Sequence, residues 1–245
     1  NAKLIDKALE ASEHLYYERG DSPIAPQALY NVATIYKAIA AYTYAADNYE
    51  LYAKNHPKHN PKRLEKALKR AAAYRQALGH YDKAINAYIE YFKRFPNSKD
   101  APLVHFKVGL IYESQHRWSQ VVVHYRKYLK TYGDKAKSEH VIAAHSKIGK
   151  AYWNMKKKKK KAHEAFNKAI GLFNEVAKKA EGEIEIDAMG ADAVAEAKFR
   201  KGETVLARMK AIRLKLPQKK FNRLLTRKLD LIVQATKILN EVAAF

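Results

Sequence analysis

ATIYKAIAAYTYAADNYELYAKNHP, residues 33–57, contains the spacing from which the architecture follows. Small and aromatic residues alternate in it at the intervals of helix turns, and a proline ends the series: Ala33, Tyr36, Ala45, Tyr49, Tyr52 and Pro57. Proline lacks a backbone N–H and clashes with the preceding turn, so it stops a helix. The segment therefore predicts two helices joined by a tight turn.

The same series recurs three times along the chain. The second copy comprises Ala72, Ala84, Tyr88, Tyr91 and Pro96, with Tyr74 one residue short of the aromatic position. The third comprises Gly109, Tyr112, Val121, Tyr125, Tyr128 and Gly133, and a looser fourth comprises Gly149, Tyr152, Ala162, Phe166 and Ala169. The copies are spaced by about 40 residues, which is the signature of a repeat architecture.

A hairpin of two antiparallel helices cannot bury its apolar face alone. The small residue at the start of each copy lets the second helix approach the first, and the aromatic residues one turn away fill the space beside that contact. Stacked hairpins then share one continuous core. The pattern predicts an all-α chain built from such hairpins.

This small–aromatic series with its closing Pro57 and Pro96 resembles the tetratricopeptide repeat over residues 26 to 178. The resemblance implies a right-handed α-solenoid of antiparallel helix hairpins. The spacing exceeds the roughly 34 residues usual for that family, which implies longer helices or links. The junction from Pro96 to Pro102 resembles bacterial arrays of outer-membrane assembly lipoproteins and Tol-system partner proteins.

We expect three regions. Residues 1–22 contain the second helix of a truncated repeat, residues 23–182 form four hairpins, and residues 183–245 form a long helix pair that caps the solenoid. The chain begins without Met and enters helical periodicity at once, so we expect it to be a fragment of a longer protein. Glu183 to Asp187 alternates apolar and polar residues, and we expect its acidic residues, with Glu181, to cap the next helix.

The segment from Ala195 to Val242, with Phe199, Gly202 and the stretch Ile212 to Pro217, resembles one in large tetratricopeptide proteins of deltaproteobacterial envelope and gliding-motility complexes. It implies a periplasmic or outer-membrane-associated scaffold, with a cytoplasmic location as the alternative. The sequence contains no Cys, which excludes disulfides, Cys-type zinc sites and thiol catalysis. We find no apolar run long enough to span a membrane and no signal core at the N-terminus.

The formal net charge is +22, from 47 basic and 25 acidic residues. Such a balance favours polyanionic partners: acidic proteins, nucleic acid or anionic surfaces. The basic residues are spread over many helices and form no known nucleic-acid module. We therefore expect a protein or peptide partner, with an acidic one favoured, and keep nucleic-acid or anionic-surface binding as the alternative.

The first helices of stacked hairpins line the inner groove in which partner segments lie. Counting from the small packing residues places a basic stripe with interleaved aromatic residues on that face: Tyr30, Asn31, Lys37, Lys66, Lys69, Arg70, Phe106, Lys107, Lys147, Lys150 and Trp153. The arrangement is similar in kind to the groove with which some tetratricopeptide domains clamp a C-terminal carboxylate. Asn31 fits that clamp, but its neighbours do not complete the required set.

Other candidate sites are weaker. The run Lys156 to Lys161 falls at the turn of the fourth hairpin, where a solvated turn is favoured over an electrostatic handle. Ten histidines form no metal-binding spacing, and the chain has neither a glycine-rich phosphate loop nor a Gly-x-Ser-x-Gly motif. We predict no catalytic residues, cofactor or metal. The expected function is a scaffold or adaptor for protein partners, not an enzyme; a helical accessory domain of an enzyme is a further alternative.

Overall fold

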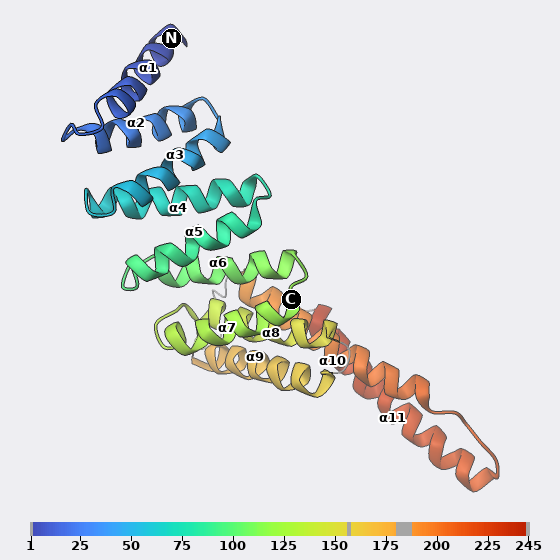
Figure 1. The fold of residues 1–245 in the computed structure, drawn as a ribbon. Helices are drawn as coiled ribbons and strands as arrows, with labels where there is room; N and C mark the ends of the chain where they lie inside the picture. The colour runs from blue at the N-terminus through green and yellow to red at the C-terminus, as the bar shows by residue number, and fades with distance from the viewer. Residues whose placement is uncertain (1, 156–157, 180–187, 244–245) are drawn as a thin grey trace. The chain divides into compact units, whose positions relative to one another are not determined.

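The computed structural model describes residues 2–155, 158–179 and 188–243, and within these ranges the chain is helical without a strand (Figure 1). The helices are α1 (Ala2–Glu18), α2 (Ala25–Ala38), α3 (Tyr42–Asn55), α4 (Pro61–Ala77), α5 (Tyr81–Arg94), α6 (Ala101–Ser114), α7 (Trp118–Tyr132), α8 (Ser138–Asn154), α9 (Lys159–Lys179), α10 (Ala188–Ala211) and α11 (Gln218–Ala243). The all-α prediction is confirmed.

The chain divides into two compact units, Asn1–Ile111 and Tyr112–Phe245. In the first, each helix packs against the next from α1 to α5 in a continuous series (Figure 1). In the second, α8 packs against α7, α9 and α10, and α10 packs against α9 and α11. Each unit is therefore a stack of antiparallel helix pairs, as the repeat predicts.

The core consists of the positions that define the repeat. Among its small residues, Ala45, Ala84, Val121 and Ala162 are all fully buried. The aromatic residues that follow them are buried as well: Tyr49, Tyr52, Tyr88, Tyr91, Tyr125, Tyr128 and Phe166. Small side chains bring two helices close together, and the rings beside them supply the large apolar area that stabilises the contact.

Three hairpins turn with the same backbone conformation. The turn residue is left-handed in each: Ala40 has φ 58°, Gly79 has φ 75° and His116 has φ 54°. In each, the N–H of the following residue donates to the carbonyl five residues earlier. The pairs are Ala41 to Tyr36 (2.9 Å), His80 to Arg75 (2.8 Å) and Arg117 to Tyr112 (2.9 Å). These bonds satisfy carbonyls that a helix end leaves without a partner.

Proline and asparagine residues set the helix ends. The Asn60 side chain accepts a hydrogen bond from the Arg63 N–H (3.1 Å), and Pro61 occupies the first turn of α4. Both devices suit a helix start, because the first N–H groups have no partner within the helix. Pro57 and Pro96 each follow the C-cap residue of α3 and α5, where they prevent continuation.

Arg75 of α4 is a buried charge that the repeat pattern does not reveal. The residue is 1% exposed. It donates from Nε to Glu50 Oε1 (2.9 Å) and from Nη2 to Glu50 Oε2 (2.7 Å), and it also bonds to Asp47. Hydrogen bonds to these carboxylates raise the pKa of Arg75, with burial acting in the opposite direction. This bidentate pair joins α3 to α4.

The C-terminal helices α10 and α11 are joined by a link that contains Leu216 and Pro217. The run Lys156 to Lys161 was expected in a turn, but Lys159, Lys160 and Lys161 form the first residues of α9. Lys156 and Lys157 lie outside the described residues. Glu181, and Glu183 to Asp187, lie outside them as well.

The turns provide a first prediction. Gly79→Ala adds a side chain that meets no atom within 4 Å, so its effect isolates the cost of the left-handed backbone. We expect a loss of about 1 kcal/mol in the free energy of unfolding, and a smaller gain for Ala40→Gly. Urea unfolding monitored by circular dichroism measures both. Equal stability of all three proteins would contradict this account.

Gly149 provides a second prediction. A Cβ at this position would lie 2.5 Å from ring atoms of Phe166, which is fully buried and cannot move aside. Gly149→Ala should therefore lower the free energy of unfolding by about 1–3 kcal/mol. Gly171→Ala is the matched control, because a Cβ there meets nothing within 4 Å and alanine favours a helix by up to about 1 kcal/mol. If the two single substitutions changed the free energy of unfolding by the same amount, steric overlap with Phe166 would not be the cause of the loss.

Candidate functional site

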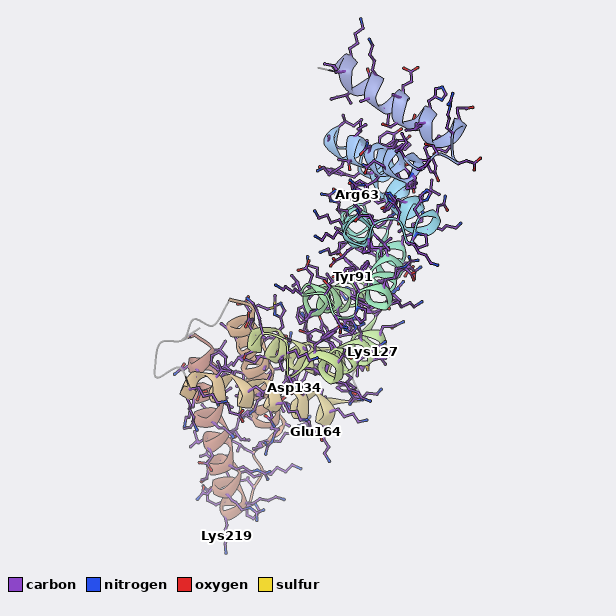
Figure 2. The ribbon with its side chains drawn as sticks, turned by 90° about the vertical axis from the view of Figure 1, so that its left-hand side faces the viewer. Arg63, Tyr91, Lys127, Asp134, Glu164 and Lys219 are labelled. Carbon is purple, nitrogen blue, oxygen red and sulfur yellow. The ribbon has the colours of Figure 1, made fainter. Side chains whose placement is uncertain are left out.

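The solvent face of α4 carries a row of basic side chains, one helix turn apart. Arg63, Lys66 and Arg70 lie on it at intervals of three and four residues, which share a helix face. Tyr30 of α2 lies beside this row and contacts both arginines. We name Tyr30, Arg63, Lys66 and Arg70 the α2–α4 patch; Arg63 is labelled in Figure 2.

Arg70 is held in one position by two tyrosines. Its Nη1 donates to the hydroxyl of Tyr49 (2.8 Å) and to that of Tyr30 (3.3 Å), and its guanidinium lies 5.6 Å from the centroid of the Tyr49 ring. Tyr49 is itself fully buried and bonds to Thr34 (3.2 Å). The guanidinium is therefore anchored on the core while its outer side remains half-exposed.

Tyr30 is the aromatic centre of the patch. Its ring packs edge-on against Tyr49 (5.5 Å between centroids) and Tyr52 (5.3 Å), and the Arg63 guanidinium lies 5.7 Å from its centroid. Burial raises the pKa of Tyr30, and the opposing influence of Arg70 is smaller. Its phenol therefore stays neutral at physiological pH and does not neutralise either arginine.

The patch lacks an internal counter-ion. Among the described residues, no carboxylate lies within ion-pair distance of Arg63, Lys66 or Arg70. Desolvated charges are normally paired with an opposite charge. The guanidinium groups of Arg63 and Arg70 have no carboxylate partner, so they can bind an anion from another molecule.

Lys69 differs from its neighbours on α4. It forms ion pairs with Glu65 (3.6 Å) and with Asp100, at the start of α6. Glu65 also accepts hydrogen bonds from Ser98 (2.5 Å) and Tyr91 (3.1 Å). Lys69 therefore belongs to the network that closes the α5–α6 junction, and its partner-binding role stays a prediction.

Lys147 and Lys150 of α8 are also paired internally. Both donate to Glu113, Lys147 to Oε2 (2.7 Å) and Lys150 to Oε1 (2.8 Å). Burial alone would raise the pKa of Glu113, but the two ammonium groups outweigh it and lower the pKa below its ordinary value. One ionised carboxylate thus serves two lysines, and these lysines offer a partner less charge than the sequence suggests.

The two predicted aromatic anchors beyond Tyr30 are not open surfaces. Phe106 is 1% exposed, because its side of α6 faces the core, and this prediction is wrong. Trp153 is half-buried and covered by cations, with Lys159 Nζ 5.1 Å and the Arg200 guanidinium 5.8 Å from its ring. Cation–π contacts of this kind occupy the ring face that a ligand would need.

The remaining predicted groove residues are Asn31, Lys37 and Lys107. Asn31 accepts a hydrogen bond from Gln27 (2.6 Å) on the exposed side of α2. Lys37 is half-exposed and Lys107 exposed. The structure thus brings Tyr30 and Arg70 together and adds Arg63, which the count from packing residues missed. Its position one turn before Lys66 was the available signal.

Metal and membrane sites gain no support from the geometry. In the described ranges, no three His, Cys, Asp or Glu side chains converge as metal ligands would. Burial, with Lys168 nearby, lowers the pKa of His145 to about 4, so this histidine is neutral. None of the described helices combines the length and the apolar composition that a membrane span requires.

The Glu113 pair provides a third prediction. Glu113→Gln removes a charge with strong native contacts, and we expect a loss of about 1–3 kcal/mol in the free energy of unfolding at pH 7. The folded-state pKa is lowered, so the stabilisation is present above the unfolded-state pKa and disappears as pH falls through the folded-state value. Urea unfolding at several pH values measures the difference, which should shrink in acid.

The control is Glu164→Gln, which changes an exposed carboxylate on α9 (Figure 2). It should leave stability unchanged across the pH range. A Glu113→Gln deficit that stays constant from neutral to acidic pH would contradict the ionic account.

A protein-family model described as tetratricopeptide repeat matches residues 67–98. The matched segment runs from the middle of α4 through α5 to Ser98. No curated protein matches the sequence.

The chain is similar to solved structures at low sequence identity. BtubC (BKLC) from P. vanneervenii is 14% identical with a TM-score of 0.52, over 99% of this chain and 91% of that one. A tetratricopeptide repeat protein from Parabacteroides merdae is 18% identical with a TM-score of 0.46, over 92% of each chain. MamA from Desulfovibrio magneticus is 18% identical with a TM-score of 0.43, over 70% of this chain and 86% of that one.

Proposed function

We propose, from the match of residues 67–98 to the tetratricopeptide repeat, that the chain is a protein-binding scaffold. In this proposal the α2–α4 patch receives an acidic segment of the partner. The observation that carries the proposal is the pair of oriented arginines, Arg63 and Arg70, that have no carboxylate partner among the described residues. The fold supports binding because stacked hairpins present extended surfaces.

The chemistry of the patch favours carboxylates. A guanidinium presents a planar fork of donors that matches a carboxylate in two parallel hydrogen bonds. Arg70 is already immobilised by Tyr49, so binding requires little further ordering of its side chain. Tyr30 adds a rigid ring beside the charges, and buried tyrosine and arginine residues dominate the energetics of protein interfaces.

The paired lysines sharpen this proposal. Lys69, Lys147 and Lys150 each have a carboxylate within the chain. An incoming acidic segment would have to displace that carboxylate, whereas Arg63 and Arg70 require no displacement. We therefore place the recognition element on α2 and α4 and not along the whole predicted stripe.

We also propose a bacterial envelope as the setting, in the periplasm or at the outer membrane. This rests on the resemblance of Ala195 to Val242 to envelope scaffolds. Fractionation of cells that express the protein tests it, and recovery in the cytoplasm would refute it.

The alternative function is binding of nucleic acid or another anionic polymer. The net charge of +22 favours it. Such binding would draw on many lysines at once and would weaken steeply with added salt. It would not depend on three particular side chains.

The experiment measures the binding of a fluorescent oligo-glutamate peptide by anisotropy. Arg63→Gln, Lys66→Gln and Arg70→Gln are combined in one variant, and we expect its affinity to fall about tenfold or more. The matched control combines Lys127→Gln, Lys130→Gln and Lys135→Gln, which removes the same charge from exposed positions on and after α7. Its affinity should change by less than about threefold.

Equal losses in the two variants would show attraction to net charge alone and refute the patch. A single-stranded DNA probe is titrated in parallel. Tighter binding of DNA than of the peptide, reduced equally by both variants, would support the alternative function. Circular dichroism of each variant confirms that helicity is retained.

A further inference from the structure

The outward face of α11 is apolar and uncovered. Its inward residues Leu231 and Ala235 are buried against α10. On the opposite side, Leu229 is 52% and Val233 70% exposed, one turn apart, with Ile232 beside them. Ile232 and Val233 border an open hollow of about 670 Å³ that Thr236, Lys237, Asn240 and Glu241 also line. Large apolar residues clustered in this way mark an interaction surface.

Helix α11 is strongly basic. The helix has six basic and two acidic side chains, and one of the two acidic residues, Glu241, pairs with Lys198 of α10 (3.1 Å). Lys219, Arg223 and Lys237 are exposed along the side that presents Val233. A second α11 would be repelled by this face, whereas an acidic helix would be attracted.

The first helix has the opposite character. α1 has four acidic and two basic side chains, which makes it the most acidic of the described helices. Asp6, Glu10, Glu13 and Glu18 line a hollow of about 390 Å³ together with Leu9 and Tyr17. Tyr17 is 63% exposed. In a chain of net charge +22, this is an unusual concentration of carboxylates around an aromatic side chain.

We propose that α1 of one copy docks on the outward face of α11 of a second copy, so that the protein associates head to tail. With the two helices antiparallel, Leu9 and Tyr17 would cover Val233 and Leu229. Glu10 and Glu18 would then oppose Lys237 and Arg223. Charge selects this pairing over the two symmetric ones. Because each copy offers one face of each kind, the contact is heterologous and can repeat. The inference is independent of the proposed function of the α2–α4 patch.

Sedimentation velocity of the chain tests the association at concentrations up to about 100 µM. We expect the average mass to rise with concentration at about 50 mM salt and to fall at about 500 mM. One variant, Glu10→Gln with Glu18→Gln, loses the acidic face of α1. The other, Val233→Asp with Lys237→Glu, loses the face of α11. Each alone should associate at least about tenfold more weakly than the unchanged chain.

Mixing the two variants tests directly whether α1 of one copy binds α11 of another. The α1 variant retains an intact α11 face, and the α11 variant retains an intact α1 face, so one contact between them remains. The mixture should form a complex of two chains and stop there. Glu164→Gln with Glu175→Gln, on exposed positions of α9, is the control for altered net charge and should associate like the unchanged chain.

A chain that stays monomeric at the highest concentration would overturn the proposal. So would self-association of either variant at the unchanged strength, because it would place the contact elsewhere. A mixture that remains monomeric while the unchanged chain associates would also overturn it, since it would exclude the α1–α11 pairing.

Discussion

Close approach of helices at small residues is the constraint from which the structure follows. Ala45, Ala84, Val121 and Ala162 admit a neighbouring helix at the shortest distance, and any larger side chain would force it away. Gly149 shows how narrow the tolerance is, because the Phe166 ring occupies the space that a single methyl group would need. The tyrosines are large because the contact beside each small residue leaves a gap of that size. The solvent faces of the helices are then free to carry charge.

Those solvent faces are less uniformly basic than the composition suggests. Glu65, Asp100 and Glu113 lie within ion-pair distance of lysines and neutralise part of their charge. Arg63 and Arg70 are held instead by tyrosine rings and hydroxyl groups. Tyrosine orients a guanidinium without cancelling its charge. The guanidinium groups therefore still attract an anion, although their side chains have lost most of their mobility.

The fold was predictable to a much greater extent than the site. Helix packing imposes a period on the sequence, so Ala45, Tyr49 and Pro57 could be interpreted from spacing alone. The partners of Lys69 and Lys147 could not, because Asp100 and Glu113 lie more than thirty residues away in sequence and meet them only through stacking. The burial of Phe106 could not be predicted for a related reason. Counting places a residue on a helix face, but which neighbour covers that face depends on the next hairpin.

The buried Arg75 pair was equally invisible, since an arginine at a helix end ordinarily suggests solvent. Its carboxylate partners, Glu50 and Asp47, come from the preceding helix, where they look like ordinary surface residues. Only the stacking of α3 on α4 turns three polar side chains into a buried connection. Local patterns thus identify what each helix is, while long-range ionic contacts depend on which helices become neighbours.

The recurring turn at Ala40, Gly79 and His116 has a consequence for how such an array can change length. Each turn is closed by hydrogen bonds within its own hairpin, so its geometry does not depend on the hairpins before or after it. A gene duplication that copies one whole period would therefore deliver a segment that already folds in register with its neighbours. Insertions within a helix would shift the small residues out of line. Lineages that carry this architecture should accordingly gain or lose hairpins in whole units.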